Sequence, residues 1–206
     1  MGNVLTSGVE YRKELMPDNK RFEARSILKL IPKREHHNTT ITCQALNSAD
    51  RQEKTAKLRL TVKFAPKVTV SVISGALANE KIPEGTEVRL ACQAEANPSN
   101  DLTYRWYING EPKIGDFTSE MMVPNISRRY HDAVIKCEVQ NSVGKNEESE
   151  TLEIRYGPAF RSPLRSIEAD EGDTVTLACD VDGNPIPDVE WIFNPSNKVM
   201  YRNAIL

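Results

Sequence analysis

The sequence of 206 residues lacks the features that identify several common classes of protein. No run approaches 18 consecutive apolar residues, so we expect no membrane-spanning helix within the chain. The residues after Met1 form neither a charged leader nor an apolar core, and no signal peptide is predicted. Lys and Arg number 27 against 29 Asp and Glu, a balance that gives no basic field for nucleic acid and no acidic tail.

Signatures of chemistry are equally scarce. Glycine occurs only 10 times, and no glycine-rich phosphate loop, Gly-x-Ser-x-Gly or His-Glu-x-x-His motif is present. The four cysteines form no Cys-x-x-Cys pair that would suggest zinc, and they are too few for a disulfide-rich miniprotein. We therefore predict that the chain is not an enzyme and that it uses no metal or other cofactor.

What the chain does have is an internal repeat. Residues 84–92 (EGTEVRLAC) match residues 171–179 (EGDTVTLAC) at six of nine positions, 87 residues apart. Residues 43–48 (CQALNS) match residues 137–142 (CEVQNS), 94 residues apart. A period of about 90 residues is typical of tandem domains, because solenoid repeats run roughly 20–50 residues.

Hydrophobic alternation with a period of two residues predicts β-strands within the repeats. Apolar side chains occupy every second position near residues 88–94, 104–108, 135–139 and 152–156, as expected of strands that bury one face. Turn residues such as those at 109–110 separate these runs. Since no segment shows a convincing helical period, the predicted fold class is all-β.

The order of cysteine and tryptophan narrows the fold class further. Cys92 precedes Trp106 by 14 residues and Cys137 by 45 residues. This order is typical of an immunoglobulin sandwich, in which a disulfide joins the two sheets beside a tryptophan. We therefore predict a disulfide between Cys92 and Cys137, with Trp106 as the core tryptophan. Cys179 and Trp191 repeat the opening of the pattern with Gly-Asn-Pro between them, which looks like an I-set immunoglobulin domain, and we predict Trp191 as the core tryptophan of that domain. The alternative is an unrelated β-sandwich with two buried free thiols.

The cysteines also predict tandem immunoglobulin-like β-sandwiches, one complete and two truncated. Cys43 stands in the context of a second cysteine and Cys179 in that of a first, so we expect both to be unpaired in this chain. We predict the C-terminal part of one domain over residues 1–64, a complete domain over 67–156 and the N-terminal part of an I-set domain over 158–206. Half a sandwich cannot close its core and leaves strand edges open, so we expect the natural protein to extend in both directions.

The predicted compartment is extracellular, because paired cysteines indicate an oxidising environment. Two Asn-x-Ser/Thr sequons, at Asn38 and Asn125, are candidate glycosylation sites and favour the same compartment. Asn97 and Asn194 are followed by proline, which rules out the modification, so we do not count them as candidates.

The histidines receive a structural interpretation. His37 and His131 each precede a repeated cysteine by six residues, at equivalent points of different domains, so they cannot share a metal. We predict that they lie at structural corners, and we assign no chemistry to His36. The tyrosine that many immunoglobulin domains carry two positions before the second cysteine is replaced by Ile41 and Ile135, which puts a tyrosine corner in doubt.

Charged clusters are interpreted as solvated faces. They occur at Lys33-Arg34-Glu35, Arg128-Arg129 and Glu147-Glu148, and their sign alternates along the chain. The alternative is the rim of a protein interface, where charges steer association more than they add affinity.

Three stretches of sequence resemble a known family. They are residues 38–45 (NTTITCQA), 105–109 (RWYIN) and 131–145 (HDAVIKCEVQNSVGK), and the last is the most specific. With the linkers at 64–68 and 156–160, they resemble the irregular chiasm–roughest and kin-of-irre proteins, which are nephrin-like immunoglobulin adhesion molecules, and the arthropod members most of all. The resemblance implies parts of domains two to four of a five-domain, single-pass type I membrane receptor whose main adhesive surface lies in its first domain.

The resemblance implies an adhesion-receptor ectodomain at cell–cell contacts. The partners it implies are other immunoglobulin receptors on opposing cells, either homophilic or of the nephrin type, with no nucleic acid and no small-molecule substrate. Short proline-containing linkers favour a semi-rigid spacer role for this part. The alternatives are an ectodomain segment of a signalling receptor for a soluble ligand, and an intracellular structural array of the muscle type.

Overall fold

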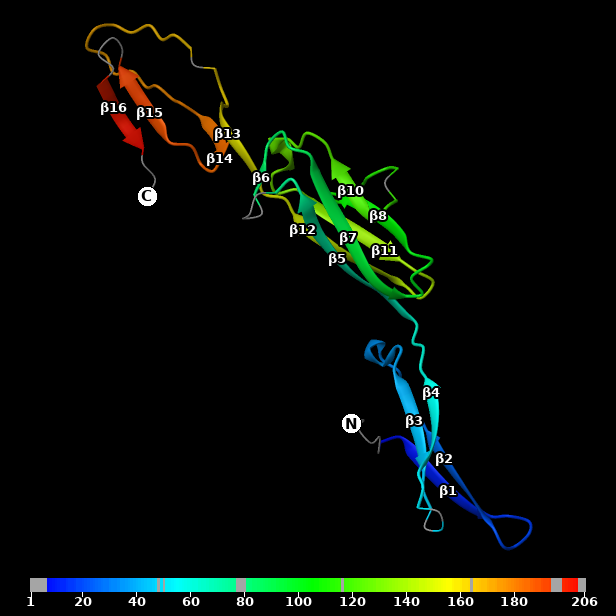
Figure 1. Cartoon of the computed structure of the whole chain (residues 1–206). Coiled ribbons are helices and arrows are strands. Elements are labelled where there is room, and N and C mark those ends of the chain that lie inside the picture. The colour runs from blue at the N-terminus through cyan, green and yellow to red at the C-terminus, as the bar shows by residue number, and fades with distance from the viewer. Residues whose placement is uncertain are drawn as a thin grey trace. The chain divides into compact units, whose positions relative to one another are not determined.

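The computed structural model of the chain describes residues 7–47, 49, 51–76, 81–115, 117–163, 165–193 and 198–203. Strands dominate these residues, and the helices among them are two 3-10 turns. The predicted all-β class is therefore confirmed. The chain divides into two compact units, Met1–Phe64 and Ala65–Leu206, which are described separately below (Figure 1).

The first unit consists of two antiparallel hairpins joined by a 3-10 turn. Its elements are β1 (Val9–Leu15), β2 (Phe22–Leu28), η1 (Arg34–His36), β3 (Thr40–Ala45) and β4 (Lys54–Arg59). β1 pairs with β2 and β3 pairs with β4, each in a sheet of two strands. In the described part of this unit, β2 and β3 each keep one edge without a strand partner.

The apolar residues of the first unit line an open groove. The groove is formed by Leu28, Leu30, Pro32, Ile41, Cys43, Ala56, Lys57, Leu58 and Leu60. Leu58 is 62% exposed, although its leucine neighbours share the same groove. A complete sandwich would cover such a face with a second pair of strands, so the inner side chains of this unit remain accessible.

The second unit begins with a sandwich of seven strands in two sheets, and one further short strand, β6, belongs to neither sheet. Its elements are β5 (Phe64–Ser74), β6 (Ile82–Pro83), β7 (Val88–Asn97), β8 (Thr103–Ile108), β9 (Glu111–Pro112), β10 (Glu120–Val123), η2 (Arg128–Tyr130), β11 (Val134–Gln140) and β12 (Lys145–Thr151). One sheet has the order β12-β11-β8-β9 and the other has the order β10-β7-β5. This arrangement matches the paired sheets of an immunoglobulin sandwich.

The core lies between these two sheets. The predicted alternation is realised, since Val88, Leu90 and Cys92 are buried on β7 while Arg89 is exposed. The other buried members of the cluster are Val68, Ile82, Trp106, Met121, Val123, Ile126, Ile135, Cys137, Val139, Leu152 and Ile154. Both sheets contribute side chains to this cluster, which explains why this part of the chain has a closed core and the first unit does not.

The remaining strands begin with β13 (Ile154–Phe160), which pairs with a different strand along each of its two edges. Its first residues run parallel to β6, and its later residues run antiparallel to β14 (Val181–Asn184). β15 (Val189–Phe193) and β16 (Lys198–Asn203) form a separate hairpin. β13 therefore continues through Gly157 and Pro158, where the sequence predicts a linker (Figure 1).

One stretch that the repeat predicts as a strand is irregular. Residues 165–180 contain no strand, although residues 175–178 correspond to Val88–Ala91 of β7. In β7 that segment pairs with β10, from Val88↔Val123 to Ala91↔Glu120. Within the described residues no strand plays the part of β10 for residues 175–178, and their backbone stays out of any ladder.

Candidate functional site

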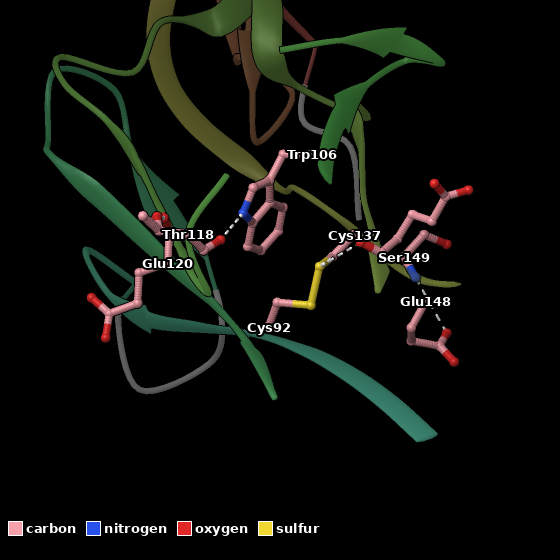
Figure 2. The surroundings of a disulfide bond; sticks show 8 residues. Cys92, Trp106, Thr118, Glu120, Cys137, Glu148 and Ser149 are labelled. Carbon is pink, nitrogen blue, oxygen red and sulfur yellow. Dashed lines mark hydrogen bonds between the residues drawn. A yellow bond between two sulfur atoms is a disulfide. The ribbon is translucent and has the colours of Figure 1, made fainter. Parts of the chain in front are cut away.

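The disulfide and its tryptophan form the centre of the complete sandwich. Cys92 on β7 is bonded to Cys137 on β11, with 6.3 Å between their Cα atoms. Trp106 lies opposite Cys137 in the ladder between β8 and β11, and only 1% of it is exposed. Its Nε1 donates a hydrogen bond to the carbonyl of Thr118 at 2.9 Å, and Figure 2 shows the indole beside the sulfur atoms. This site joins the sheets and has no reactive group open to solvent.

The histidines lie at corners, and each is hydrogen-bonded to a backbone amide near the C-terminal end of its domain. His131 Nδ1 accepts a hydrogen bond from the backbone N–H of Ile154 at 3.2 Å, and His37 Nδ1 accepts one from Val62 at the same distance. In both cases Nδ1 is the hydrogen-bond acceptor and the backbone N–H is the donor. A histidine thus forms a corner link where a tyrosine is usual, and Ile135 fills the core position.

An aromatic ring follows each corner histidine, two residues after the hydrogen-bonded amide. His131 contacts Tyr156 edge-on, with 5.9 Å between ring centroids. The guanidinium of Arg128 lies over the same ring, 4.9 Å from its centroid. We call these three residues the aromatic corner. The first unit contains a counterpart, in which His37 stacks edge-on against Phe64 and Arg34 lies over the same ring.

These contacts add a structural role to two residues of the charged clusters. Arg34 and Arg128 were expected on solvated faces, but both guanidinium groups stack on aromatic rings. Such cation–π contacts stabilise by about 0.5–1 kcal/mol at exposed sites. Arg34 and Arg128 are partly exposed and also pack on these rings, while Glu147 and Glu148 are exposed as predicted.

Glu84 fixes the arginine of the aromatic corner. Its Oε1 accepts hydrogen bonds from the backbone N–H of Arg128 at 2.9 Å and from the Arg128 Nε at 3.2 Å. Its Oε2 accepts from Nη2 at 2.9 Å. These bonds from the Arg128 side chain and backbone hold the pKa of Glu84 below its usual value. The same side-chain pairing raises the pKa of Arg128. The fork geometry orients the guanidinium over Tyr156.

Tyr156 connects this corner to the next stretch of chain. Its hydroxyl donates to Asp182 Oδ1 at 3.4 Å, and Asn184 Nδ2 donates to the carbonyl of Ile154 at 2.7 Å. Partial burial raises the pKa of Tyr156, and the nearby carboxylate of Asp182 acts in the same direction. Asp182 also lies 3.8 Å from the guanidinium of Arg161. We name the chain from Glu84 through Arg128 and Tyr156 to Asp182 the junction network.

The residues of the junction network hold neighbouring segments of the backbone in place, and they are not arranged for catalysis. It joins the turn after β6 to η2, β13 and β14, which come from both sides of Gly157 and Pro158. In the part of the chain that the structure describes, no group of three His, Cys, Asp or Glu residues could hold a metal ion. No described helix has the length and hydropathy needed to cross a bilayer.

The other predicted site residues lie apart from one another. Cys43 is an exposed free thiol on β3, and Cys179 is a partly exposed free thiol before β14. Trp191 lies on β15 and is partly exposed. Asn38 and Asn125 are both exposed and both adopt a positive φ, of 60° and 49°. The structure therefore brings together Cys92, Cys137 and Trp106 only.

The sequence interpretation missed the junction network. A signal for it was present, since an Arg-x-x-His motif recurs at Arg34 and Arg128 with an aromatic residue near the end of each domain. The pairing of Glu84 with Arg128 and of Tyr156 with Asp182 had no such signal, because the paired residues are 44 and 26 positions apart in the sequence.

Comparisons with known proteins agree with the fold and extend over nearly the whole chain. The CD80-like C2-set immunoglobulin domain matches residues 2–54, and the immunoglobulin I-set domain matches residues 158–203. The irregular chiasm C-roughest protein of Drosophila melanogaster is 50% identical over 97% of this chain and 28% of that protein. Human kin of IRRE-like protein 1 is 30% identical over 91% of this chain and 24% of that protein.

A solved structure shows the same fold. The ectodomain of mouse nectin-like molecule 4 superposes with a TM-score of 0.55 at 17% identity, over 82% of this chain and 52% of that one. The chain spans about a quarter of the length of the curated relatives reported above. Those relatives are immunoglobulin-superfamily proteins and not enzymes.

Proposed function

Because this chain belongs to the irregular chiasm and kin-of-irre family of immunoglobulin proteins, we propose that it is an ectodomain segment of a cell-surface adhesion receptor. The segment acts mainly as a spacer that holds a distant adhesive domain in a defined direction. The higher identity to the Drosophila protein than to the human one supports an arthropod-type receptor.

The observation that carries the spacer role is the continuity of β13 through the junction. A flexible linker would let consecutive domains swing freely. Here β13 is hydrogen-bonded to β6 before Gly157 and to β14 after it, and the junction network adds side-chain bonds on both sides. Bending at this point has to break strand pairing and the Tyr156–Asp182 contact together, so the connection favours one direction.

The proposed partners are other immunoglobulin-superfamily receptors on an opposing cell, bound homophilically or as nephrin-type heterophilic pairs. The proposed location is the extracellular face of the plasma membrane at cell–cell contacts. The disulfide between Cys92 and Cys137 supports an oxidising compartment, and the exposure of Asn38 and Asn125 supports glycan attachment at both sequons.

Bead aggregation tests this function. Beads carrying residues 67–156 are compared with beads carrying a longer ectodomain of the same receptor that includes its first domain. We expect the longer ectodomain to cluster the beads and the isolated domain to leave them dispersed. Comparable clustering by residues 67–156 alone would move the adhesive site into this segment and refute the spacer role. Failure of both would favour a receptor for a soluble ligand.

A further inference from the structure

The sequon at Asn125 lies in the turn between β10 and η2, and its three residues have very different surroundings. Asn125 is exposed and adopts a positive φ of 49°. Ile126 is fully buried in the core of the complete sandwich. The Oγ of Ser127 is also buried, and in the described part of the chain it has no hydrogen-bond partner. Of the two polar side chains that define the sequon, only the asparagine is therefore open to solvent.

Backbone hydrogen bonds hold the middle residue of this sequon. The N–H of Ile126 donates to the carbonyl of Thr86 at 2.9 Å, and the carbonyl of Ile126 accepts from the N–H of Gly85 at 2.7 Å. The turn after β6 thus fixes the sequon against the sandwich. Bringing the hydroxyl of Ser127 to the surface would break both bonds and take the buried Ile126 side chain out of the core.

The hydroxyl of Ser127 does not stabilise the folded domain. Ser127 is the N-cap residue of η2, a position at which a serine hydroxyl usually accepts a hydrogen bond from a backbone amide of the first turn. Its side chain forms no such cap bond in the described structure. A buried hydroxyl without a partner is unfavourable, because it loses its hydrogen bonds to water and gains none in exchange. The folded sandwich therefore gives no reason for a serine at this position, whereas the sequon does.

The sequon at Asn38 has different surroundings. Asn38 and Thr40 are both exposed. The repeat aligns them with Asp132 and Val134 of the complete sandwich, and these two residues are exposed as well. Both positions are thus accessible in a closed immunoglobulin domain, so this sequon presents its amide and its hydroxyl together in the folded protein.

We propose that Asn125 accepts an N-linked glycan only before the complete sandwich closes, whereas Asn38 can accept one at any stage of folding. The proposal rests on the proposed extracellular location, which takes the chain through the secretory pathway. The transferase recognises the hydroxyl of a sequon as well as its amide, and folding removes the hydroxyl of Ser127 from its reach. The exposed side chain of Asn125 then carries the glycan into solvent.

The transfer is a substitution at the first sugar of a lipid-linked oligosaccharide. A bond forms between Asn125 Nδ2 and the sugar C1, and the bond from C1 to the lipid diphosphate breaks. The diphosphate leaves with the electron pair of that bond, and one proton of Nδ2 passes to a base of the transferase. No oxidant or reductant takes part.

Closure of the sandwich and glycan transfer therefore compete for the same segment. Asn125 lies between Cys92 and Cys137 in the sequence, inside the loop that their disulfide closes. Once β10 has paired with β7 and this disulfide has formed, the segment is held on both sides. Faster closure lowers the occupancy of Asn125 and slower closure raises it, while the occupancy of Asn38 does not respond.

Transfer to the full chain in two states tests the proposal. Unglycosylated chain with the Cys92–Cys137 bond formed, and the same chain reduced and alkylated, are offered to solubilised oligosaccharyltransferase and a lipid-linked oligosaccharide. Peptide mass spectrometry measures occupancy at each sequon. We expect modification of Asn125 to be about tenfold or more higher in the alkylated chain, and Asn38 to be modified in both. Equal modification of Asn125 in the two states, or none in either, would overturn the proposal. The assay involves no adhesion, so its result is independent of the bead test.

Substitutions at Ser127 separate the sequon from the fold. Ser127→Ala should abolish transfer to Asn125 in both states and leave the melting temperature of the full chain equal to or above that of the parent. Ser127→Thr keeps the hydroxyl, so the alkylated chain should still be modified. Thr86→Val is the matched control, since it removes a hydroxyl that donates to the carbonyl of Pro83 at 2.8 Å and should lower the melting temperature. An equal fall in Ser127→Ala would show that its hydroxyl supports the fold, contrary to the proposal.

Discussion

Trp106 and Trp191 occupy matching places in the repeat, yet their surroundings differ. Trp106 is covered by both sheets, and its Nε1 is satisfied by Thr118. Trp191 is partly exposed on a two-stranded hairpin. The same residue type is therefore a core residue only where the opposing strands are present, which is a property of the whole domain and not of the local sequence.

Trp106→Ala should destabilise the complete sandwich by about 3–5 kcal/mol, because it opens a cavity beside the disulfide. Urea unfolding followed by far-ultraviolet circular dichroism measures the loss. Tyr107→Ala is the matched control, since its ring is only partly buried on the neighbouring position and should cost much less. Equal losses for the two variants would mean that Trp106 is not the core tryptophan.

The lowered pKa of Glu84 predicts that the protein loses part of its folding stability at acid pH. Its folded-state pKa lies below the ordinary value of 4.5, so its contribution to stability is complete above that value. The contribution is lost as the pH falls through the lowered folded-state pKa. We expect Glu84→Gln to flatten the decline in stability below about pH 4.5, measured by urea unfolding across an acidic series. Glu87→Gln, at an exposed residue bonded to Arg89, is the control, and an equal flattening there would contradict the assignment.

At the scale of elements, the sequence predicted strands well and the connection after Tyr156 less well. The alternation through Leu152, Ile154 and Tyr156 was sufficient to predict the start of β13. Pro158 lacks an amide donor and reads as a linker residue, but it falls at a register shift of the β13–β14 ladder, where no donor is required. That tolerance depends on the partner strand, which the local sequence does not reveal.

Arg128→Ala should loosen the connection through the junction network. Spin labels placed at Glu111→Cys and Asp188→Cys, in a chain that also carries Cys43→Ser and Cys179→Ser, report the distribution of distances across β13. We expect the distribution to broaden in Arg128→Ala because the Tyr156 ring loses its stacked guanidinium and Glu84 loses its partner.

Arg129→Ala is the matched control for that measurement. Its guanidinium lies over Tyr130 at 5.3 Å and takes no part in the junction network, so the distribution should stay as narrow as in the parent. A broad distribution already present in the parent chain would contradict a stiff connection, and with it the spacer role.

At the scale of the molecule, the cysteine order indicated the immunoglobulin fold and the pairing of Cys92 with Cys137. The contacts that tie a domain to its flanks were not visible in the sequence, because they join residues far apart in it. Pro66 is an example. The predicted domain starts at Lys67, but Pro66 is fully buried, and its carbonyl accepts a hydrogen bond from Asn146 Nδ2 at 2.8 Å.

The predicted domain over residues 67–156 should fold alone, because it contains both sheets and its own disulfide. We expect one cooperative thermal transition and a Cys92–Cys137 bond by peptide mapping. A span over residues 65–156 should melt at a higher temperature, since it restores Pro66 to the core. Non-cooperative unfolding of both spans would place the domain boundaries elsewhere.

The double pairing of β13 also limits how this protein can change over evolutionary time. Linkers between domains usually accept insertions, because the entropy of closing a longer loop grows slowly. One residue inserted among 157–160 would instead move both Ala159 and Phe160 to the other face of the strand from the one each now occupies. The insertion would also shift them out of register with Asp182 and Val181. Substitutions in this connection are therefore tolerated far more readily than changes in its length, and related receptors should vary here in side chains while keeping the same number of residues.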